Sequence, residues 1–226
     1  MPGIIKLQLN EKLYVRDPDE TELGRKIVSH SVRLIDEVGF ESFSFKKLAI
    51  EIKSTEASVY RYFENKQKLL LYLVNCYWIW LRFQLHVKTE SVKNPKEKLK
   101  IALRIITESN MNNPVTGLDE SALFRIVVNE SQKVFLVKNV DTANKEGLFR
   151  EYKLFCKLIA EIISELNPKY KFANTLVSTI IEGAHHQLFF ADHFPSLTDL
   201  KKQEQDCNKL NTFLEHLVLA AILPKS

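Results

Sequence analysis

The chain has 226 residues, of which 45% are hydrophobic and 27% charged, with six glycines, seven prolines and a formal net charge of +4. This composition excludes a disordered chain and disfavours a turn-rich β fold, while the length suits two domains. A net charge of this size does not by itself indicate nucleic-acid binding, so the distribution of charge along the chain matters more.

Neither secretion nor membrane insertion is predicted. The three cysteines, Cys76, Cys156 and Cys207, lie far apart and cannot form an even disulfide framework. The first ten residues lack the apolar core of a signal peptide. The most apolar stretch, 69–85, is shorter than the roughly 20 apolar residues that span a bilayer. We therefore expect a cytoplasmic protein with no membrane contact.

The first predicted helix begins near residue 17 and ends at Gly39. Asp17 can cap it, Pro18 suits the first helical position, and Glu20 can complete a capping box. Apolar residues then recur at steps of three and four, which is the pattern of one buried helix face. Gly39 can adopt the left-handed conformation that ends a helix.

Two short helices are predicted next. Ser44 can cap the first, which lasts about two turns. Lys53 and Ser54 break the chain, and Thr55 can cap the second short helix, from residue 56 to about 62. Three helices therefore stand close together in the N-terminal part of the chain.

A long helix from Lys66 to about Lys88 is predicted to connect two domains, 1–65 and 66–226. Asn94 and Pro95 open the next helix, which is expected to end near Met111 before turn residues at 112–117. The remaining helices are expected at 119–133, 144–166, 172–192 and 198–221. No segment alternates as a strand would, so the fold class is all-α.

A short helix, a tight turn and a second short helix form the helix-turn-helix arrangement, which places the second helix in the major groove of DNA. The run 49–69 resembles the DNA-binding segment of the TetR family. In that family an alanine on the second helix precedes a turn, a recognition helix ending in Tyr-x-Tyr/His-Phe, and then x-x-Lys-x-x-Leu. The matching residues here are Ala49, Tyr60, Tyr62, Phe63, Lys66 and Leu69.

The resemblance extends from about residue 23 to 73, and is only architectural beyond that. Within the motif the chain departs from the family at the turn, where Gly-Val-Ser is usual and Lys53-Ser54-Thr55 stands here. Lys53 then has to adopt a left-handed backbone, at a cost of about 1 kcal/mol.

The resemblance implies an N-terminal three-helix DNA-binding domain joined by a long helix to a C-terminal helical domain for ligand binding and dimerisation. It implies a homodimeric transcriptional regulator that represses a palindromic operator in double-stranded DNA until a small-molecule effector releases it. No enzymatic activity and no cofactor are implied.

Two groups of residues are expected to contact DNA. Phosphate contacts are expected from Tyr60 and Tyr62, from Lys66, whose charge is disfavoured at a helix start, and from the caps Ser44 and Thr55. The residues expected to reach base edges are Lys46, Glu56, Ala57 and Ser58.

The C-terminal half carries candidate ligand and dimer residues, for each of which ordinary core packing is the alternative. An apolar or amphipathic effector is expected against the aromatic residues Tyr77, Trp80, Phe149, Tyr152 and Phe155. Gly183 and Ala184 allow a second helix to approach closely. The full set of expected dimer contacts is Ile180, Gly183, Ala184, Gln187, Leu210, Leu214, Leu217 and Val218.

The competing class of function is a helical metalloenzyme. Glu182, His185 and His186 supply metal-ligand types, and Glu182 with His185 has the Glu-x-x-His spacing of di-iron bundles. Such bundles need that motif twice, and the sequence has no second copy. The regulator is therefore favoured.

Overall fold

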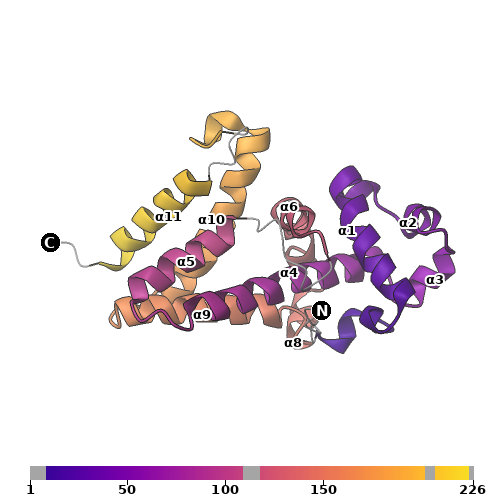
Figure 1. Ribbon diagram of the computed structural model, residues 1–226, viewed down its shortest axis with the longest axis horizontal. Coiled ribbons are helices and arrows are strands. Elements are labelled where there is room, and N and C mark those ends of the chain that lie inside the picture. Colours follow the sequence, from indigo (N-terminus) through magenta and orange to yellow (C-terminus); the bar gives the residue numbers. More distant parts are fainter. Residues whose placement is uncertain (1–8, 109–117, 202–206, 224–226) are drawn as a thin grey trace. The chain divides into compact units, whose positions relative to one another are not determined.

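The computed structural model describes residues 9–108, 118–201 and 207–223. Every regular element within these residues is a helix, which confirms the predicted all-α class (Figure 1). The chain divides into two compact units. Unit 1 consists of 1–80 with 109–151, and unit 2 consists of 81–108 with 152–226. The two units are groups of residues that pack together. The predicted domain boundary after residue 65 separates DNA binding from the other functions, and it stays a prediction.

Unit 1 contains the predicted DNA-binding helices and three later ones. Short 3-10 helices, η1 and η2, precede α1, and the long helix α4 begins in this unit. The elements are η1 Glu11–Leu13, η2 Pro18–Glu20, α1 Glu22–Ser42, α2 Phe45–Glu51, α3 Glu56–Tyr60, α4 Lys66–Thr89, α6 Glu120–Glu130, α7 Gln132–Phe135 and α8 Val140–Lys145.

The start of the first helix differs from the prediction. Asp17 does accept a hydrogen bond from the Asp19 amide, but it caps only the single turn η2. The true N-cap of α1 is Thr21, whose side chain accepts from the Gly24 amide and whose backbone is extended. Two consecutive caps compete here, and the later one begins the longer helix.

Gly39 interrupts α1 without ending it. Its φ of +75° lies in the left-handed region, as its predicted role requires, and it produces a kink. Helical structure nevertheless continues to Ser42, and the Phe43 amide donates to the Gly39 carbonyl. The kink directs the end of α1 towards the start of α2.

Two predicted helices of the middle region are each split in two. The segment expected at 119–133 breaks at Ser131 into α6 and α7. The segment expected at 144–166 contains the end of α8 and the whole of α9 (Arg150–Leu166), separated at Gly147, whose φ is +78°. Apolar periodicity continues through both breaks, so it did not reveal them.

Unit 2 contains α5 (Pro95–Thr107), most of α9, α10 (Ala173–His193) and α11 (Cys207–Ile222). Asn94 caps α5 as predicted, but α5 ends at Thr107, and the expected end near Met111 lies outside the described residues. The last helix was expected from residue 198. Residues 195–197 instead form the 3-10 helix η3, and α11 is described from Cys207.

The core of unit 2 includes the contact of α11 with α5, which lie side by side in Figure 1. Leu210, Leu214, Val218 and Ile222 recur every four residues along α11 and are buried. The Thr107 hydroxyl also donates to Asn211 Oδ1 over 2.8 Å. The apolar face of α11 is thus largely occupied within its own unit.

Candidate nucleic-acid interface

The helix-turn-helix is held together by buried side chains and a tight turn. Leu48, Ala49 and Val59 are buried. Lys53 has a φ of +55°, which confirms the predicted left-handed backbone, and the Ser54 amide donates to the Ala49 carbonyl over 2.8 Å. The turn between α2 and α3 therefore has the tight geometry of a helix-turn-helix, although Lys53 must adopt a backbone conformation that favours glycine.

Both predicted caps of the motif are present. The side chain of Ser44 accepts from the Lys47 amide, and that of Thr55 accepts from the Ser58 amide. The Ser58 and Thr55 hydroxyls also hydrogen-bond to each other over 2.8 Å. These contacts fix the start of each short helix, where free backbone N–H groups face outward.

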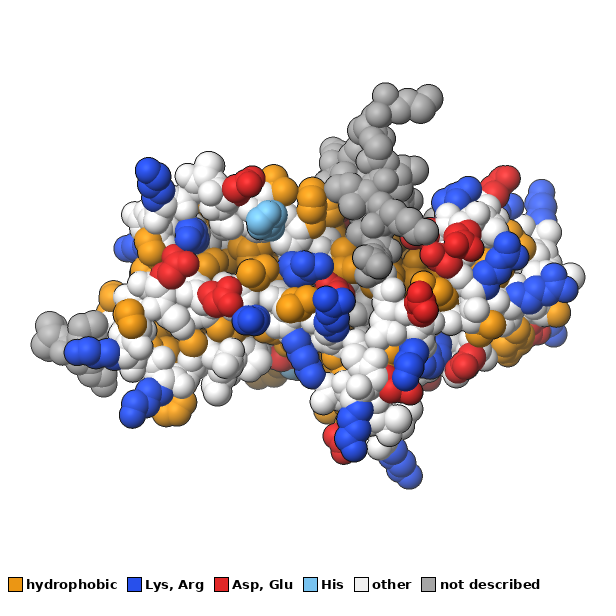
Figure 2. All heavy atoms as spheres, turned by 90° about the horizontal axis from the view of Figure 1, so that it is seen from below, with side chains coloured by type: hydrophobic (Ala, Val, Ile, Leu, Met, Phe, Trp, Pro, Cys, Tyr) orange, Lys and Arg blue, Asp and Glu red, His pale blue; other side chains and the backbone are white. Residues whose placement is uncertain are grey.

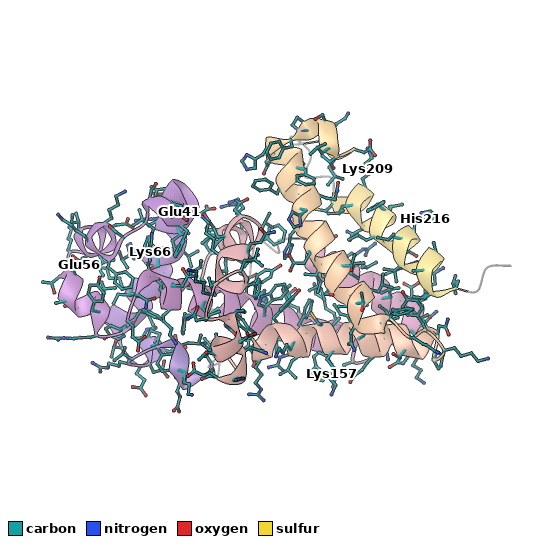
Figure 3. The ribbon with its side chains drawn as sticks, turned by 180° about the vertical axis from the view of Figure 1, so that it is seen from behind. Glu41, Glu56, Lys66, Lys157, Lys209 and His216 are labelled. Carbon is teal, nitrogen blue, oxygen red and sulfur yellow. The ribbon has the colours of Figure 1, made fainter. Side chains whose placement is uncertain are left out.

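The first turn of α3 is open to solvent. Thr55, Glu56 and Ala57 are exposed and Ser58 is half-buried. Figure 3 labels Glu56 on α3, at the edge of unit 1. Three of the four predicted base-reading residues therefore lie together on one accessible turn, and Lys46 is exposed on α2.

Tyr60 and Tyr62 have different environments. Tyr60 is 48% exposed, and its ring packs edge-on against Phe45 with ring centroids 4.9 Å apart. Tyr62 is 3% exposed, and its hydroxyl is hydrogen-bonded to Thr21 Oγ1 over 2.7 Å. The phosphate contact expected of Tyr62 is therefore replaced by a bond between the end of the motif and the cap of α1.

Lys66 also has a different role from the expected one. Its ammonium donates to the carbonyls of Phe40, Glu41 and Phe43 at 3.1, 3.2 and 3.3 Å. Figure 3 shows Lys66 and Glu41 from the side opposite to Figure 1. A lysine has three N–H donors, and all three are used on the backbone between α1 and α2. The first residue of α4 thus fastens α4 to the DNA-binding helices instead of reaching outward.

An ion cluster joins α1 to α2. Glu51 accepts hydrogen bonds from His30, at 2.9 Å, and from Arg33. Burial alone would raise the pKa of Glu51, but these two bonds outweigh it and hold the pKa below its usual value. The carboxylate is therefore ionised at neutral pH and supports the position of α2.

A second set of ion pairs joins α1 to α6 and α7. Arg125 binds Asp36 through two bonds of 2.9 and 2.7 Å. The Glu130 carboxylate accepts from the Phe40 amide over 3.0 Å and pairs with Lys133, 2.7 Å away. Since Phe40 directly follows the kinked Gly39, α6 holds the end of α1 that leads into the motif. Sequence reasoning missed these partners, because they lie about 90 residues apart in the chain.

On the face that Figure 2 shows, the described basic residues do not form one patch. On the face shown in Figure 2, Lys and Arg side chains are interspersed with acidic ones. Ile50, on α2, is 71% exposed, which is unusual for an isoleucine in a helix. The geometry of the motif, more than overall charge, identifies this surface.

Comparison with known proteins agrees with that geometry. The family model described as bacterial regulatory proteins of the tetR family matches residues 27–73. This range contains most of α1, the whole motif and the start of α4. Residues 27–73 are therefore a DNA-binding segment of the TetR type. Members of the TetR family are transcriptional regulators that bind DNA, and DNA binding is the function that the geometry of the helix-turn-helix suits. No curated protein matches the chain in sequence.

Solved structures share the TetR fold over nearly the whole chain, although identity is low. AibR in complex with isovaleryl coenzyme A and operator DNA has a TM-score of 0.58 at 15% identity, covering 89% of this chain and all of its own. A regulator from Saccharomonospora viridis in complex with choline has 0.61 at 16%, covering 91% of this chain and all of its own. The superantigen PfiT has 0.60 at 14%, covering 93% and 100%. At these identities the likeness concerns the fold alone.

The aromatic residues predicted to bind an effector are largely buried. Tyr77, Trp80 and Phe149, in unit 1, and Phe155, in unit 2, are at most 7% exposed. Tyr152 is half-buried, and its hydroxyl donates to Glu182 over 3.2 Å. A cavity of about 250 Å³ in unit 1 is lined by none of the five. It lies between the first turns of α4 and the segment from α7 to Leu148.

The predicted dimer residues fall into two groups. Ile180, Ala184, Leu210, Leu214 and Val218 are buried within the single chain, so they belong to the core and do not form an interface surface. Gly183 and Gln187 are half-buried, and nothing lies within 4 Å of where a side chain at Gly183 would begin. Leu217 is 38% exposed, and Phe213, one turn earlier on α11, is 52% exposed.

The metal-site alternative receives no support. Within 9–108, 118–201 and 207–223, no three His, Cys, Asp or Glu side chains are gathered as a metal ion requires. His186 Nδ1 instead lies 2.8 Å from the Glu182 carbonyl. His185 is buried, and burial lowers its pKa to about 4, with a smaller contribution from His186.

Among the described helices, none combines the length and hydropathy of a membrane span.

Proposed function

We propose that this protein is a TetR-family transcriptional repressor, without enzymatic activity, that binds a two-fold operator as a homodimer and is released by a small molecule. The observation that carries the proposal is the exposed first turn of α3, capped by Thr55 and supported from beneath by buried Val59. A helix-turn-helix inserts this part of its second helix into the major groove. Binding to chromosomal DNA also implies a cytoplasmic location.

Base reading is assigned to Glu56, Ala57, Ser58 and Lys46. Ala57 suits a thymine methyl group, Glu56 a cytosine amine, and Lys46 a guanine, while a serine hydroxyl accepts or donates. Phosphate binding is assigned to Tyr60, whose exposed side chain is oriented by Phe45, and to the hydroxyls and free N–H groups at Ser44 and Thr55.

Dimerisation is assigned to the outer faces of α10 and α11. Phe213 and Leu217 form an exposed apolar stripe on α11, and the open space at Gly183 suits the approach of a second helix. A two-fold dimer requires half-sites about one helical turn of DNA, roughly 34 Å, or a multiple of that, apart.

Release is assigned to a small-molecule effector that alters the attachment of α1. Lys66 fixes the start of α4 to the corner between α1 and α2, and Glu130 and Arg125 fix α6 to α1. A shift of α4 or α6 would therefore move the DNA-binding helices. Two proteins of the same fold are described with small molecules bound, isovaleryl coenzyme A and choline.

Selection of bound sequences from random duplex DNA tests the proposal. We expect a two-fold symmetric site, and sedimentation should show a dimer at micromolar concentration. Recovery of no preferred sequence, or of a site without symmetry, would contradict it. Once an effector is found, it should bind more weakly in the presence of operator, by the same factor by which it weakens operator binding, typically about 5 to 150 fold.

A further inference from the structure

Four side chains of α4 and α6 form one cluster in unit 1. Tyr77 and Trp80 are three residues apart on α4, and Glu120 and Phe124 are four apart on α6, so each pair shares a helix face. The Tyr77 and Phe124 ring centroids are 6.3 Å apart, and the indole of Trp80 borders the Glu120 carboxyl. The Glu120 carboxyl therefore lies beside the Trp80 indole, on the same face of α6 as Phe124, whose ring contacts Tyr77.

The carboxyl group of Glu120 has one polar neighbour, the uncharged Trp80 indole, and no cation beside it among the described residues. Glu120 is 9% exposed and neither of its oxygens touches solvent. The Tyr77 hydroxyl is also buried, and it has no hydrogen bond among the described residues. Burial raises the pKa of Glu120 to about 7, the Trp80 indole opposes this change, and Asp119 adds slightly to it. A buried carboxylate without a counter-charge is costly to keep.

The other buried carboxylate of α6, that of Glu130, has a structural role. Glu130 is also 9% exposed, but it accepts from the Phe40 amide and pairs with Lys133. Its burial is balanced by these contacts, and it joins α6 to α1. Glu120 lies in the first turn of α6, where the helix dipole favours an acid, but it has no comparable cation.

We propose that the effector is an organic cation, such as an alkylammonium, whose charged group binds Glu120 against Tyr77, Trp80 and Phe124. The inference rests on the proposed function in supposing that an effector exists. A carboxylate supplies the counter-charge, and aromatic faces attract cations most strongly where water is excluded. Phe124 is the half-buried member of the cluster, so its ring marks the side from which solvent, and hence a ligand, approaches.

Intrinsic fluorescence provides a direct test without DNA. Both tryptophans of the chain, Trp78 and Trp80, lie on this part of α4, so binding at the cluster should alter their emission. The probes are choline, benzyltrimethylammonium, and 3,3-dimethylbutanol, the uncharged isostere of choline. We expect the cations to bind about tenfold more tightly than the isostere, or better.

Variants of the cluster provide the second half of the test. Glu120→Gln keeps the size of the side chain and should weaken cation binding about tenfold while leaving the isostere unaffected. Phe124→Leu should weaken cation binding by a smaller factor. Glu90→Gln, which makes the same change of charge at an exposed position at the end of α4, should leave binding unchanged. Equal binding of choline and its isostere, no cation binding, or full cation affinity in Glu120→Gln would overturn the proposal.

Operator release, measured separately, distinguishes this inference from the proposed function. If a cation binds at Glu120 but does not release operator DNA, the cation site stands and the regulatory proposal fails. If an uncharged molecule releases DNA while the cations do not bind, the regulatory proposal stands and the cation site fails.

Discussion

Replacing Lys66 with methionine should destabilise unit 1 without removing a phosphate contact. Lys66→Met keeps the length of the stem but removes the ammonium that donates to three carbonyls between 3.1 and 3.3 Å. It also removes the charge 4.7 Å from the centroid of the Phe40 ring. The corner between α1 and α2 then loses its link to α4.

The expected loss of stability is about 2–4 kcal/mol. A hydrogen bond to a charged group contributes about 1.5–3 kcal/mol, but the freed carbonyls are partly accessible and can bind water, so three bonds do not add in full. The cation–π contact contributes about 0.5–1 kcal/mol. Lys68→Met is the matched control, because it makes the same change on the same turn of α4 where the ammonium donates to a single carbonyl, that of Lys12. Because that bond is exposed and water competes for both of its partners, the control should cost only about 1 kcal/mol.

Urea unfolding followed by circular dichroism measures both variants, and the salt dependence of operator binding is measured alongside. Since all three donors of Lys66 are used within the protein, the salt slope should change by clearly less than the one unit, roughly, that accompanies loss of a phosphate contact. A Lys66→Met variant as stable as the control, with a slope lower by about one unit, would refute the reasoning and restore the phosphate role.

Three further predictions concern Ser58, Glu120 and Leu217. Ser58→Ala should change base preference at one position of each half-site in a sequence selection, without altering the salt slope. Because Glu120 has a raised pKa when folded, the stability it contributes is full below its unfolded pKa and is lost as pH rises through about 7. Raising the pH from 5 to 8 should therefore lower the urea midpoint of the wild type more than that of Glu120→Gln, and equal changes would contradict this. Leu217→Arg should produce monomers in sedimentation at micromolar concentration, whereas Thr212→Arg, elsewhere on α11, should stay dimeric.

The sequence determined the features that depend on neighbouring residues. The caps at Ser44, Thr55 and Asn94 were predictable because a cap hydrogen bond spans only two or three residues. The left-handed Lys53 was predictable because the turn of the motif requires that backbone in any sequence. The bounds of α4 followed from its long apolar pattern. These features identified the helix-turn-helix before any packing was known.

Only the tertiary structure decided which of these side chains are buried and which are exposed. Tyr60 and Tyr62 look equivalent in sequence, but Tyr60 is the last residue of α3 and Tyr62 follows the helix, and only Tyr62 meets Thr21. The apolar stripe of α11 fitted a dimer as well as a core, until the packing of α5 buried Leu214 and left Leu217 exposed. Which of these side chains is buried depends on residues distant in the chain. The apolar periodicity of a helix predicts that one face is covered, but it does not tell whether the covering surface comes from the same chain or from a second copy.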